Sequence, residues 1–297
     1  MDVGVLVTVP PYAPFLAELA GHPLVRGLRL NTVMPLAEPH AEVLARLSAL
    51  GPPLWVDLKG RQLRTVGAAV PPFTEVRVSH RVTVRTPCDA FFADGREHAR
   101  VAAVDGDRLI LEDSPRRFVG PGESVNIVDA SLRIDGTLTE GDRLYLAAMR
   151  ELRLDRVMLS FVECPGDVEE LREELPGAEL LLKIESRKGL AFARRHGASL
   201  GRLMAARGDL YVEVLEPHRI VGALRAIVEA DPLAVAASRI LASLARHPVP
   251  ESADVSDVAF LLGLGYRTLM LGDEVCLRRD SVLAALSLLE AIAREML

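Results

Sequence analysis

The sequence predicts an α/β fold, namely a (β/α)8 TIM barrel with a small inserted β-barrel-like lid domain. Short apolar runs alternate with amphipathic segments along most of the 297 residues. Near-continuous apolar runs are typical of parallel strands buried on both faces, and the intervening segments predict helices. We count eight such runs, which is the number that closes a barrel of this kind. The alternation is interrupted once, and the interruption predicts the inserted domain.

The predicted barrel strands share an apolar, β-branched character, and they are followed by turns or helical patterns. They lie at residues 3–9, 25–31, 53–60, 156–162, 179–185, 202–206, 233–238 and 267–272. Segments such as "PHAEVLARLSAL" and "PHRIVGALRAIVEA" carry the periodicity of amphipathic helices and predict the outer layer. We therefore expect the barrel to comprise residues 1–65 and 139–297.

Residues 66–138 contain no long helical pattern. They read as short β-rich stretches, such as "TEVRVSHRVTVRT" and "ESVNIVDASLRID", separated by the turn signals "ADG", "VDGD" and "GPGE". The barrel pattern resumes at "LTEGDRLYLAAMREL", where Thr139 followed by Asp142 predicts a capping box. We therefore expect residues 66–138 to form a separate β-rich lid domain.

Composition excludes several classes of protein. The net charge is −6 and the basic residues are scattered, which argues against a nucleic-acid-binding surface. Every apolar run is much shorter than the roughly twenty residues that cross a bilayer, so we expect no membrane partner. The chain opens without the pattern of a secretory signal, and we expect a cytoplasmic protein. The cysteines, Cys88, Cys164 and Cys276, are too far apart to predict disulfides or a zinc site.

Polar residues at the ends of the predicted strands are the candidate functional residues, because catalytic side chains of such barrels lie at the carboxyl ends of the strands. They are Arg29, Asn31, Asp57, Lys59, Ser160, Lys183, Glu185, Arg207, Gly208, Asp209, Ser238 and Glu274. Lys183 and Glu185 are two apart on one strand, so they face the same side. With Asp209 from the next strand, Glu185 can hold one hard divalent cation, since Mg²⁺ typically takes one or two protein carboxylates.

Lysine itself is informative in this chain, which has three lysines and thirty-two arginines. A lysine pKa moves on burial, whereas an arginine stays protonated. Lys183 therefore occupies a position where an ammonium performs a task that a guanidinium cannot. The alternative to a functional role is that Lys183 and Glu185 form only a salt bridge at a strand end.

Several motifs, in order along the chain, resemble those of pyruvate kinases. "LLLKIES" resembles the family's strand with the lysine and the metal-binding glutamate, and "LMAARGDLYVEV" resembles its "ARGDLGVE" element. "LRLNTVMP", "VDLKGRQLRTVG" and "LSFVECPGDVEELREEL" stand where the family has its arginine–asparagine, aspartate–lysine–glycine and "SFIR" segments. The similarity runs along nearly the whole chain. No counterpart of the family's C-terminal regulatory domain follows, so we expect no effector site of that kind.

The resemblance implies an enzyme that binds phosphoenolpyruvate or pyruvate, and ADP or ATP, with Mg²⁺ or Mn²⁺ as cofactor. The implied metal ligands are Glu185 and Asp209. Lys183 would contact the phosphate and the enolate oxygen, and Arg29 would hold phosphate. The remaining implied substrate-binding residues are Gly208, Asp209, Ser238, Arg64, Asn31 and Asp57, with Asp94 at the lid position. We also expect a homo-oligomer.

Departures from the family pattern leave the reaction open. Val33 and Met34 stand where the family has a serine that binds K⁺ and a histidine on the nucleotide side, and Gln62 replaces the glutamate of K⁺-dependent members. We therefore assign no K⁺ site. Three hypotheses remain: a pyruvate kinase; a Mg²⁺- or Mn²⁺-dependent lyase, aldolase or decarboxylase without nucleotide; and a catalytically inactive binding or regulatory homologue.

Overall fold

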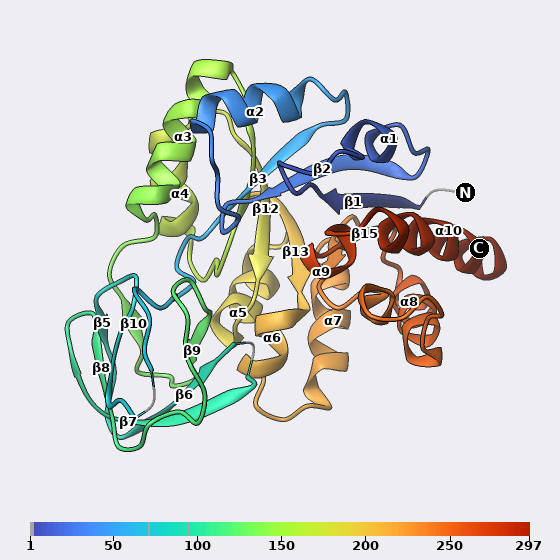
Figure 1. Cartoon of the computed structure of the whole chain (residues 1–297). Coiled ribbons are helices and arrows are strands. Elements are labelled where there is room, and N and C mark those ends of the chain that lie inside the picture. The colour runs from blue at the N-terminus through green and yellow to red at the C-terminus, as the bar shows by residue number, and fades with distance from the viewer. Residues whose placement is uncertain (1–2, 71, 94) are drawn as a thin grey trace.

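A closed barrel of parallel strands forms the centre of the molecule, in the order β1-β15-β14-β13-β12-β11-β3-β2 (Figure 1). The computed structural model describes residues 3–70, 72–93 and 95–297. The barrel strands are β1 Gly4–Thr8, β2 Val25–Asn31, β3 Leu54–Leu58, β11 Arg156–Leu159, β12 Glu179–Ile184, β13 Arg202–Ala206, β14 Val235–Ala237 and β15 Thr268–Leu271. Each lies within one of the predicted apolar runs, so the predicted α/β barrel is confirmed.

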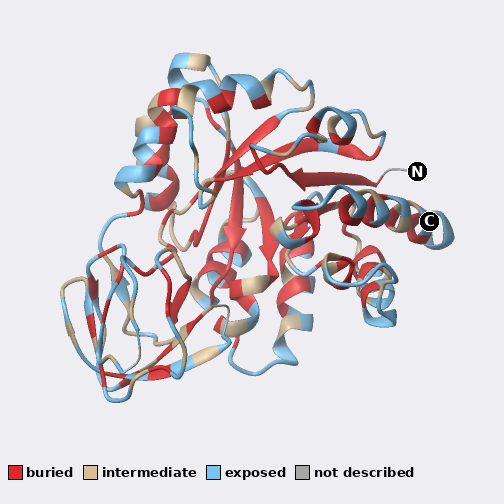
Figure 2. Ribbon diagram, in the orientation of Figure 1, coloured by how far each residue is buried: buried red, intermediate tan, exposed pale blue. Residues whose placement is uncertain are grey.

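Helices surround the barrel and bury their apolar faces against it (Figure 2). They are α1 Leu16–Ala20, α2 His40–Ser48, α3 Glu140–Leu152, α4 Pro165–Glu174, α5 Arg187–His196, α6 Arg207–Glu213, α7 Arg219–Ala230, α8 Ser252–Leu264, α9 Asp273–Cys276 and α10 Arg279–Met296, with a 3-10 turn η1 at Ala242–Ala245. In the described ranges, no helix combines the length and the apolar character that crossing a bilayer requires.

The interior of the barrel is filled by apolar side chains. They come from successive strands and comprise Leu6, Trp55, Met158, Leu181, Met204, Ala206, Val235, Ala237 and Met270. Side chains two apart on a strand point to the same face. Asp57 therefore follows Trp55 inward on β3, and Lys183 follows Leu181 inward on β12. A polar layer thus lies directly above the apolar plug, toward the carboxyl ends of the strands.

Antiparallel strands between β3 and α3 form the second body of the molecule, at the lower left in Figure 1. A five-stranded sheet has the order β4-β8-β7-β6-β9, and β10 pairs with β5. The strands are β4 Glu75–Arg77, β5 Val82–Thr83, β6 Cys88–Phe92, β7 Glu97–Asp105, β8 Arg108–Leu111, β9 Val125–Ile127 and β10 Arg133–Ile134. This body has its own apolar core, built around residues such as Phe92 and Leu109. We call it the lid and propose residues 66–138 as its extent.

The Asp142 carboxylate accepts hydrogen bonds from both chain segments that connect the barrel with the lid. It accepts the backbone N–H of Lys59 at 2.8 Å and of Gly60 at 3.1 Å, where the chain leaves β3. It also accepts the N–H of Thr139 at 3.0 Å, where the chain returns, and the Thr139 hydroxyl caps α3 in exchange. The predicted capping box is therefore present, and its buried carboxylate also holds the outgoing strand.

We expect Asp142→Ala to lower the free energy of unfolding by about 2–4 kcal/mol, because it removes a helix cap and leaves buried N–H groups without an acceptor. Urea unfolding followed by circular dichroism measures the effect. Glu140→Ala, at an exposed position of the same helix, serves as the control and should change stability by about 0.5 kcal/mol or less. Equal losses in the two variants would contradict this account of Asp142.

Candidate active site

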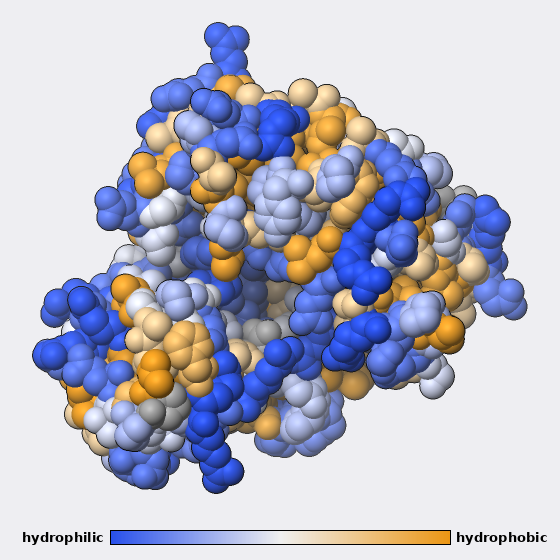
Figure 3. Space-filling view, in the orientation of Figure 1, coloured by the Kyte–Doolittle hydropathy of each residue, from blue (hydrophilic) through white to orange (hydrophobic). Residues whose placement is uncertain are grey.

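A cavity of about 720 Å³ lies at the carboxyl ends of the barrel strands, between the barrel and the lid. Figure 3 shows this side of the molecule hollowed between the two bodies, with hydrophilic side chains around the hollow. The cavity is lined by every described residue to which the family resemblance gives a role: Arg29, Asn31, Asp57, Arg64, Lys183, Glu185, Gly208, Asp209 and Ser238. Lys59, Ser160 and Glu274 also line it, whereas Arg207, the other strand-end candidate, does not. Asp94, the predicted lid residue, lies outside the described residues. The roles assigned to these residues stay predictions.

The Lys183 ammonium is held by three oxygens from three different segments. Its Nζ donates to Ser160 Oγ at 2.7 Å and lies 3.2 Å from Asp57 Oδ1 and 3.3 Å from Glu185 Oε1. The Ser160 hydroxyl in turn donates to the carbonyl oxygen of Leu58 at 2.8 Å. An ammonium has three N–H donors and rotates to suit its acceptors, whereas a guanidinium is a planar fork. The position therefore fits a lysine.

Asp57 connects Lys183 with Arg29. Its Oδ2 accepts the Nε–H of Arg29 at 2.8 Å, while Oδ1 faces Lys183. The Arg29 Nη1 donates to Thr8 Oγ1 at 2.9 Å and to Asp273 Oδ1 at 2.8 Å. Asp273 also accepts the amide N–H of Asn31 at 2.7 Å. The Arg29 guanidinium is thus committed largely to two carboxylates in this arrangement.

Burial and mutual attraction set the protonation of this cluster. Burial opposes ionisation of Asp57, but Lys183 and Arg29 hold its pKa well below the usual value. Burial also opposes the charge of Lys183, but Asp57 and Glu185 raise its pKa. Burial raises the pKa of Glu185 to about 7 against the effect of Lys183, and the nearby Asp209 carboxylate adds to the rise. Glu185 is therefore the carboxyl of this cluster that titrates near neutral pH.

Asp209 belongs to the first turn of α6, directly after β13, and its side chain is buried. Its Oδ2 accepts the amide N–H of Gln62 at 2.7 Å, and the Gln62 carbonyl accepts an N–H of Arg64. A second N–H of Arg64 donates to the carbonyl oxygen of Gly122 in the lid at 2.6 Å. Arg64, a predicted substrate-binding residue, is therefore linked through Gln62 to Asp209, a predicted metal ligand.

The loop after β14 is held in an unusual backbone conformation. Ser238 and Arg239 have φ of 72° and 60°, a region that residues other than glycine occupy infrequently. Arg207 fixes the loop, because its Nη2 donates to the carbonyl oxygen of Ser238 at 2.7 Å while Nη1 lies 2.6 Å from Asp257 on α8. A Cβ on Gly208 would lie 3.6 Å from Ser238 Oγ, which is ordinary contact, so space alone does not require glycine there.

Three residues to which the family resemblance gave no substrate or metal role also belong to the site. Asp273, rather than its neighbour Glu274, contacts Arg29 and Asn31. Lys59 donates to Asn31 Oδ1 at 3.1 Å, and burial together with Arg64 places its pKa well below the usual value. Gln62, treated only in connection with K⁺, contacts Asp209. The rarity of lysine singled out Lys183 and also marks Lys59.

The fold and this cavity define a TIM-barrel protein with a charged site at the carboxyl-terminal mouth, below an inserted lid. A family profile described as "Pyruvate kinase, barrel domain" matches residues 76–277, which is more than half of the chain. The chain belongs to the pyruvate kinase family.

Curated relatives agree with this assignment at low identity. The chain is 23% identical to a pyruvate kinase of Borreliella burgdorferi over 304 residues, which cover 92% of the chain and 63% of that protein. It is 29% identical to a pyruvate kinase of Chlamydia pneumoniae, with 84% and 54% covered, and 28% identical to one of Methanocaldococcus jannaschii, with 80% and 54% covered. The chain thus spans less than two thirds of the length of these relatives.

We expect Lys183→Met to lower the free energy of unfolding by about 3–5 kcal/mol at pH 8, because it leaves Asp57 and Glu185 buried without their shared ammonium. The loss should shrink at pH 5.5, where Glu185 in the variant is protonated. Lys188→Met is the matched control: Lys188 is partly exposed, its Nζ donates to the Leu132 carbonyl oxygen at 2.7 Å and lies 3.9 Å from Glu163, so we expect a smaller loss of about 1–2 kcal/mol. A loss in Lys183→Met that is independent of pH would contradict this electrostatic account.

The raised pKa of Glu185 also predicts a pH dependence of the wild-type protein. The pKa is higher in the folded state than the ordinary 4.5, so ionisation is disfavoured by folding. The contribution of Glu185 to the free energy of unfolding therefore falls as the pH rises from about 4.5 to about 7. Guanidinium unfolding at pH 5 and pH 8 should show a smaller difference in Glu185→Gln than in the wild type. An unchanged difference would count against the assignment.

Proposed function

We propose that this chain catalyses Mg²⁺- or Mn²⁺-dependent phosphoryl transfer between phosphoenolpyruvate and ADP, giving pyruvate and ATP. The observation that supports it most is the buried Lys183 ammonium, which lies between Asp57 and Glu185 in a cavity that Asp209 also lines. An ammonium beside metal-binding carboxylates is suited to stabilising an enolate. Family membership supports the same reaction. A cytoplasmic location and a homo-oligomeric state belong to this proposal.

The carboxylates of Glu185 and Asp209 fit a hard divalent cation. They come from the ends of neighbouring strands, β12 and β13, and their mutual repulsion contributes to the raised pKa of Glu185. A cation between them would relieve that repulsion. Among the described residues, no group of three or more His, Cys, Asp or Glu side chains is placed to hold a metal ion. In this proposal the protein contributes the carboxylates of Glu185 and Asp209. Mg²⁺ commonly completes such a shell with water and substrate oxygens, whose charge it neutralises.

The chain's own residues then have distinct tasks. Lys183 would donate to the bridging oxygen of phosphoenolpyruvate and stabilise the negative charge that develops there. Arg29 would contact the phosphate, and the backbone N–H groups of Gly208 and Asp209 would meet the substrate carboxylate. An oxygen of the ADP β-phosphate attacks phosphorus, the bond to the enol oxygen breaks, and the enolate takes one proton at carbon to become pyruvate. Positioning and charge stabilisation account for most of such catalysis.

The remaining predicted residues would position the substrate or the side chains that contact it. Asp57 would hold the Lys183 and Arg29 side chains in place, since it contacts both. Asn31 and Ser238 line the same cavity, and Arg64 would approach the nucleotide.

A reaction without nucleotide is the second candidate. Arg64 donates to Gly122 in the lid and to Gln62, so its guanidinium already has protein partners on the predicted nucleotide side. Val33, where the family has a serine, is 39% exposed and presents an apolar surface near that side. These two observations favour a metal-dependent lyase, aldolase or decarboxylase acting on a pyruvate-enolate type of substrate.

A catalytically inactive homologue is the third candidate. Its specific support is the internal pairing of the site: Arg29 contacts two carboxylates, and Gln62 donates to Asp209. Substrate would have to displace these contacts, each of which contributes on the order of 1–3 kcal/mol when charge-assisted.

A coupled assay with phosphoenolpyruvate, ADP and Mg²⁺ tests the first candidate. We expect pyruvate formation that Lys183→Met reduces by about 10³-fold or more, because the variant removes charge stabilisation in the transition state, and that Lys188→Met leaves nearly unchanged. Omitting K⁺ should have no effect, since Gln62 and Val33 replace the residues associated with K⁺. Turnover that is equal in both lysine variants would contradict the proposed role of Lys183.

Thermal unfolding with Mn²⁺ and oxalate, an analogue of the pyruvate enolate, separates the candidates. A raised melting temperature without kinase turnover would favour the reaction without nucleotide. An unchanged melting temperature would favour the inactive homologue. Glu185→Gln should abolish any rise, because it removes one metal-binding carboxylate, and Glu229→Gln on the exposed face of α7 should preserve it.

A further inference from the structure

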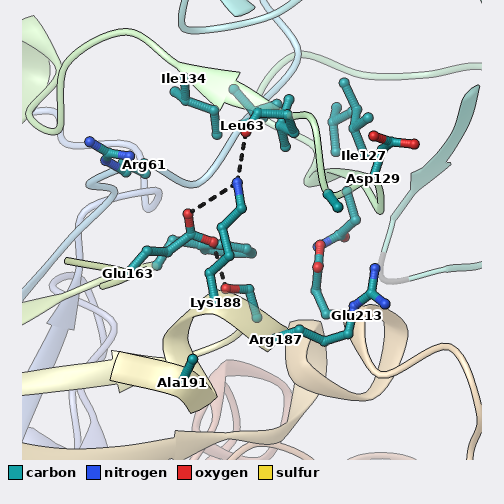
Figure 4. A pocket seen from close by; sticks show the side chains of 16 residues that line it. Arg61, Leu63, Ile127, Asp129, Ile134, Glu163, Arg187, Lys188, Ala191 and Glu213 are labelled. Atoms are coloured by element: carbon teal, nitrogen blue, oxygen red, sulfur yellow. Dashed lines mark hydrogen bonds and ion pairs between the residues drawn. The ribbon is translucent and has the colours of Figure 1, made fainter. Parts of the chain in front are cut away.

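A second pocket of about 390 Å³ lies between the lid and the barrel, beside α5 and α6 (Figure 4). It lies apart from the catalytic cavity, since the described residues that line one do not line the other. Its lid side comes from β9, β10 and the segment between them, and its barrel side comes from α5, α6 and the loops after β11 and β12. The volume is in the range of small-molecule sites, which typically span about 300–1,000 Å³.

One side of the pocket is apolar. The lid contributes Val125, Ile127, Leu132 and Ile134, and Ala191 of α5 lies opposite them. Figure 4 shows Ile134 and Ile127 along the upper side and Ala191 at the lower side of the space. A ligand with an apolar body would be desolvated here, which favours binding by roughly 25 cal/mol for each Å² buried.

The polar end of the pocket is formed by two buried acceptors, one from each body. Glu213 at the end of α6 is 8% exposed, and Asn126 of β9 is 2% exposed. The Asn126 amide donates to Glu213 Oε1 across 3.4 Å, which is a long hydrogen bond. The Asn126 carbonyl oxygen is buried, and it has no hydrogen-bond partner among the described residues. Buried polar atoms are nearly always paired, so this oxygen points to a donor supplied from outside the chain.

The charges around the pocket favour a cationic donor. Burial raises the pKa of Glu213 to about 8, and Asp209 and Glu163 contribute to the rise. The rise reflects a carboxylate charge without a close compensating cation, so a cation bound beside Glu213 would stabilise its ionised form. The Lys188 ammonium is engaged elsewhere, since it donates to the carbonyl oxygen of Leu132 at 2.7 Å and lies 3.9 Å from Glu163.

The other two cations on the lining do not neutralise Glu213 either. The Nε of Arg61 lies 2.7 Å from a carboxylate oxygen of Asp167 on α4. Arg187 lowers the pKa of Glu213, but its effect is smaller than those of burial, Asn126, Asp209 and Glu163. None of these described cations forms a hydrogen bond or ion pair with Glu213 or with the Asn126 carbonyl oxygen, so the buried end of the pocket has acceptors without a cationic partner.

We propose that this pocket binds a small molecule with an apolar body and a primary ammonium head. The ammonium would donate to Glu213 and to the Asn126 carbonyl oxygen, and the body would pack against the apolar wall of the lid. Because Asn126 belongs to the lid and Glu213 to the barrel, one ligand would join the two bodies beside the catalytic cavity. The inference does not depend on the phosphotransfer reaction proposed above.

Titration calorimetry on the full chain tests the site with 2-phenylethylamine, which has one ring and an ammonium. The comparison ligand is 3-phenylpropanoate, which keeps the ring and replaces the ammonium with a carboxylate. We expect saturable binding of the amine and at least about tenfold weaker binding of the carboxylate, since a charge-assisted hydrogen bond is worth about that factor. Equal or tighter binding of the carboxylate would overturn the proposal, because it would place the head group at Arg187 and Lys188.

Two variants assign the binding to this pocket. Glu213→Gln keeps the shape and removes the carboxylate, and we expect amine affinity to fall by about tenfold or more. Ala191→Phe, at an exposed position of α5, places a ring in the pocket and should abolish binding without burying new polar groups. Glu229→Gln is the matched control and should bind the amine normally. Amine binding that survives Ala191→Phe would overturn the site, whether or not Glu213→Gln folds.

Discussion

The site depends on one ammonium shared by two buried carboxylates at the carboxyl end of the barrel. Removing a charge from water is costly, and it is tolerated only when close partners compensate for it. Asp57 and Glu185 compensate for Lys183, and Arg29 compensates for the second oxygen of Asp57. The same contacts fix which groups carry charge, because they lower the pKa of Asp57 and leave that of Glu185 near neutrality. The buried charges of the site therefore compensate for one another within the protein.

The lid is attached at points that also shape the site. Asp142 holds the outgoing and returning chain segments together at the end of β3, which carries Asp57 and is followed by Lys59. Arg64 donates to Gly122 of the lid and to Gln62, and Gln62 in turn donates to Asp209. At the C-terminal end of α6, Asn126 meets Glu213. The short helix α6 therefore carries one acidic residue toward each of the two spaces below the lid, which places both spaces within one structural unit.

The sequence predicted the barrel because each strand is a local pattern, and strand parity alone placed Lys183 and Glu185 on one face. The capping box at Thr139 was likewise readable from a spacing of three residues. The contact between Arg29 and Asp273 could not be predicted from the sequence, because the two residues are 244 positions apart. The adjacent acids Asp273 and Glu274 were equally plausible partners. The pairing order of the lid strands and the second pocket depend on long-range packing for the same reason. No local period distinguishes them.

The position of a bound Mn²⁺ ion would show whether Glu185 and Asp209 share one cation. Crystals grown at pH 8 with Mn²⁺, where Glu185 is ionised, would reveal the ion by its anomalous scattering. We predict one ion coordinated by carboxylate oxygens of Glu185 and Asp209, with the Lys183 ammonium beside it. An ion bound elsewhere in the cavity, or density that leaves these two carboxylates without metal at saturating Mn²⁺, would contradict it.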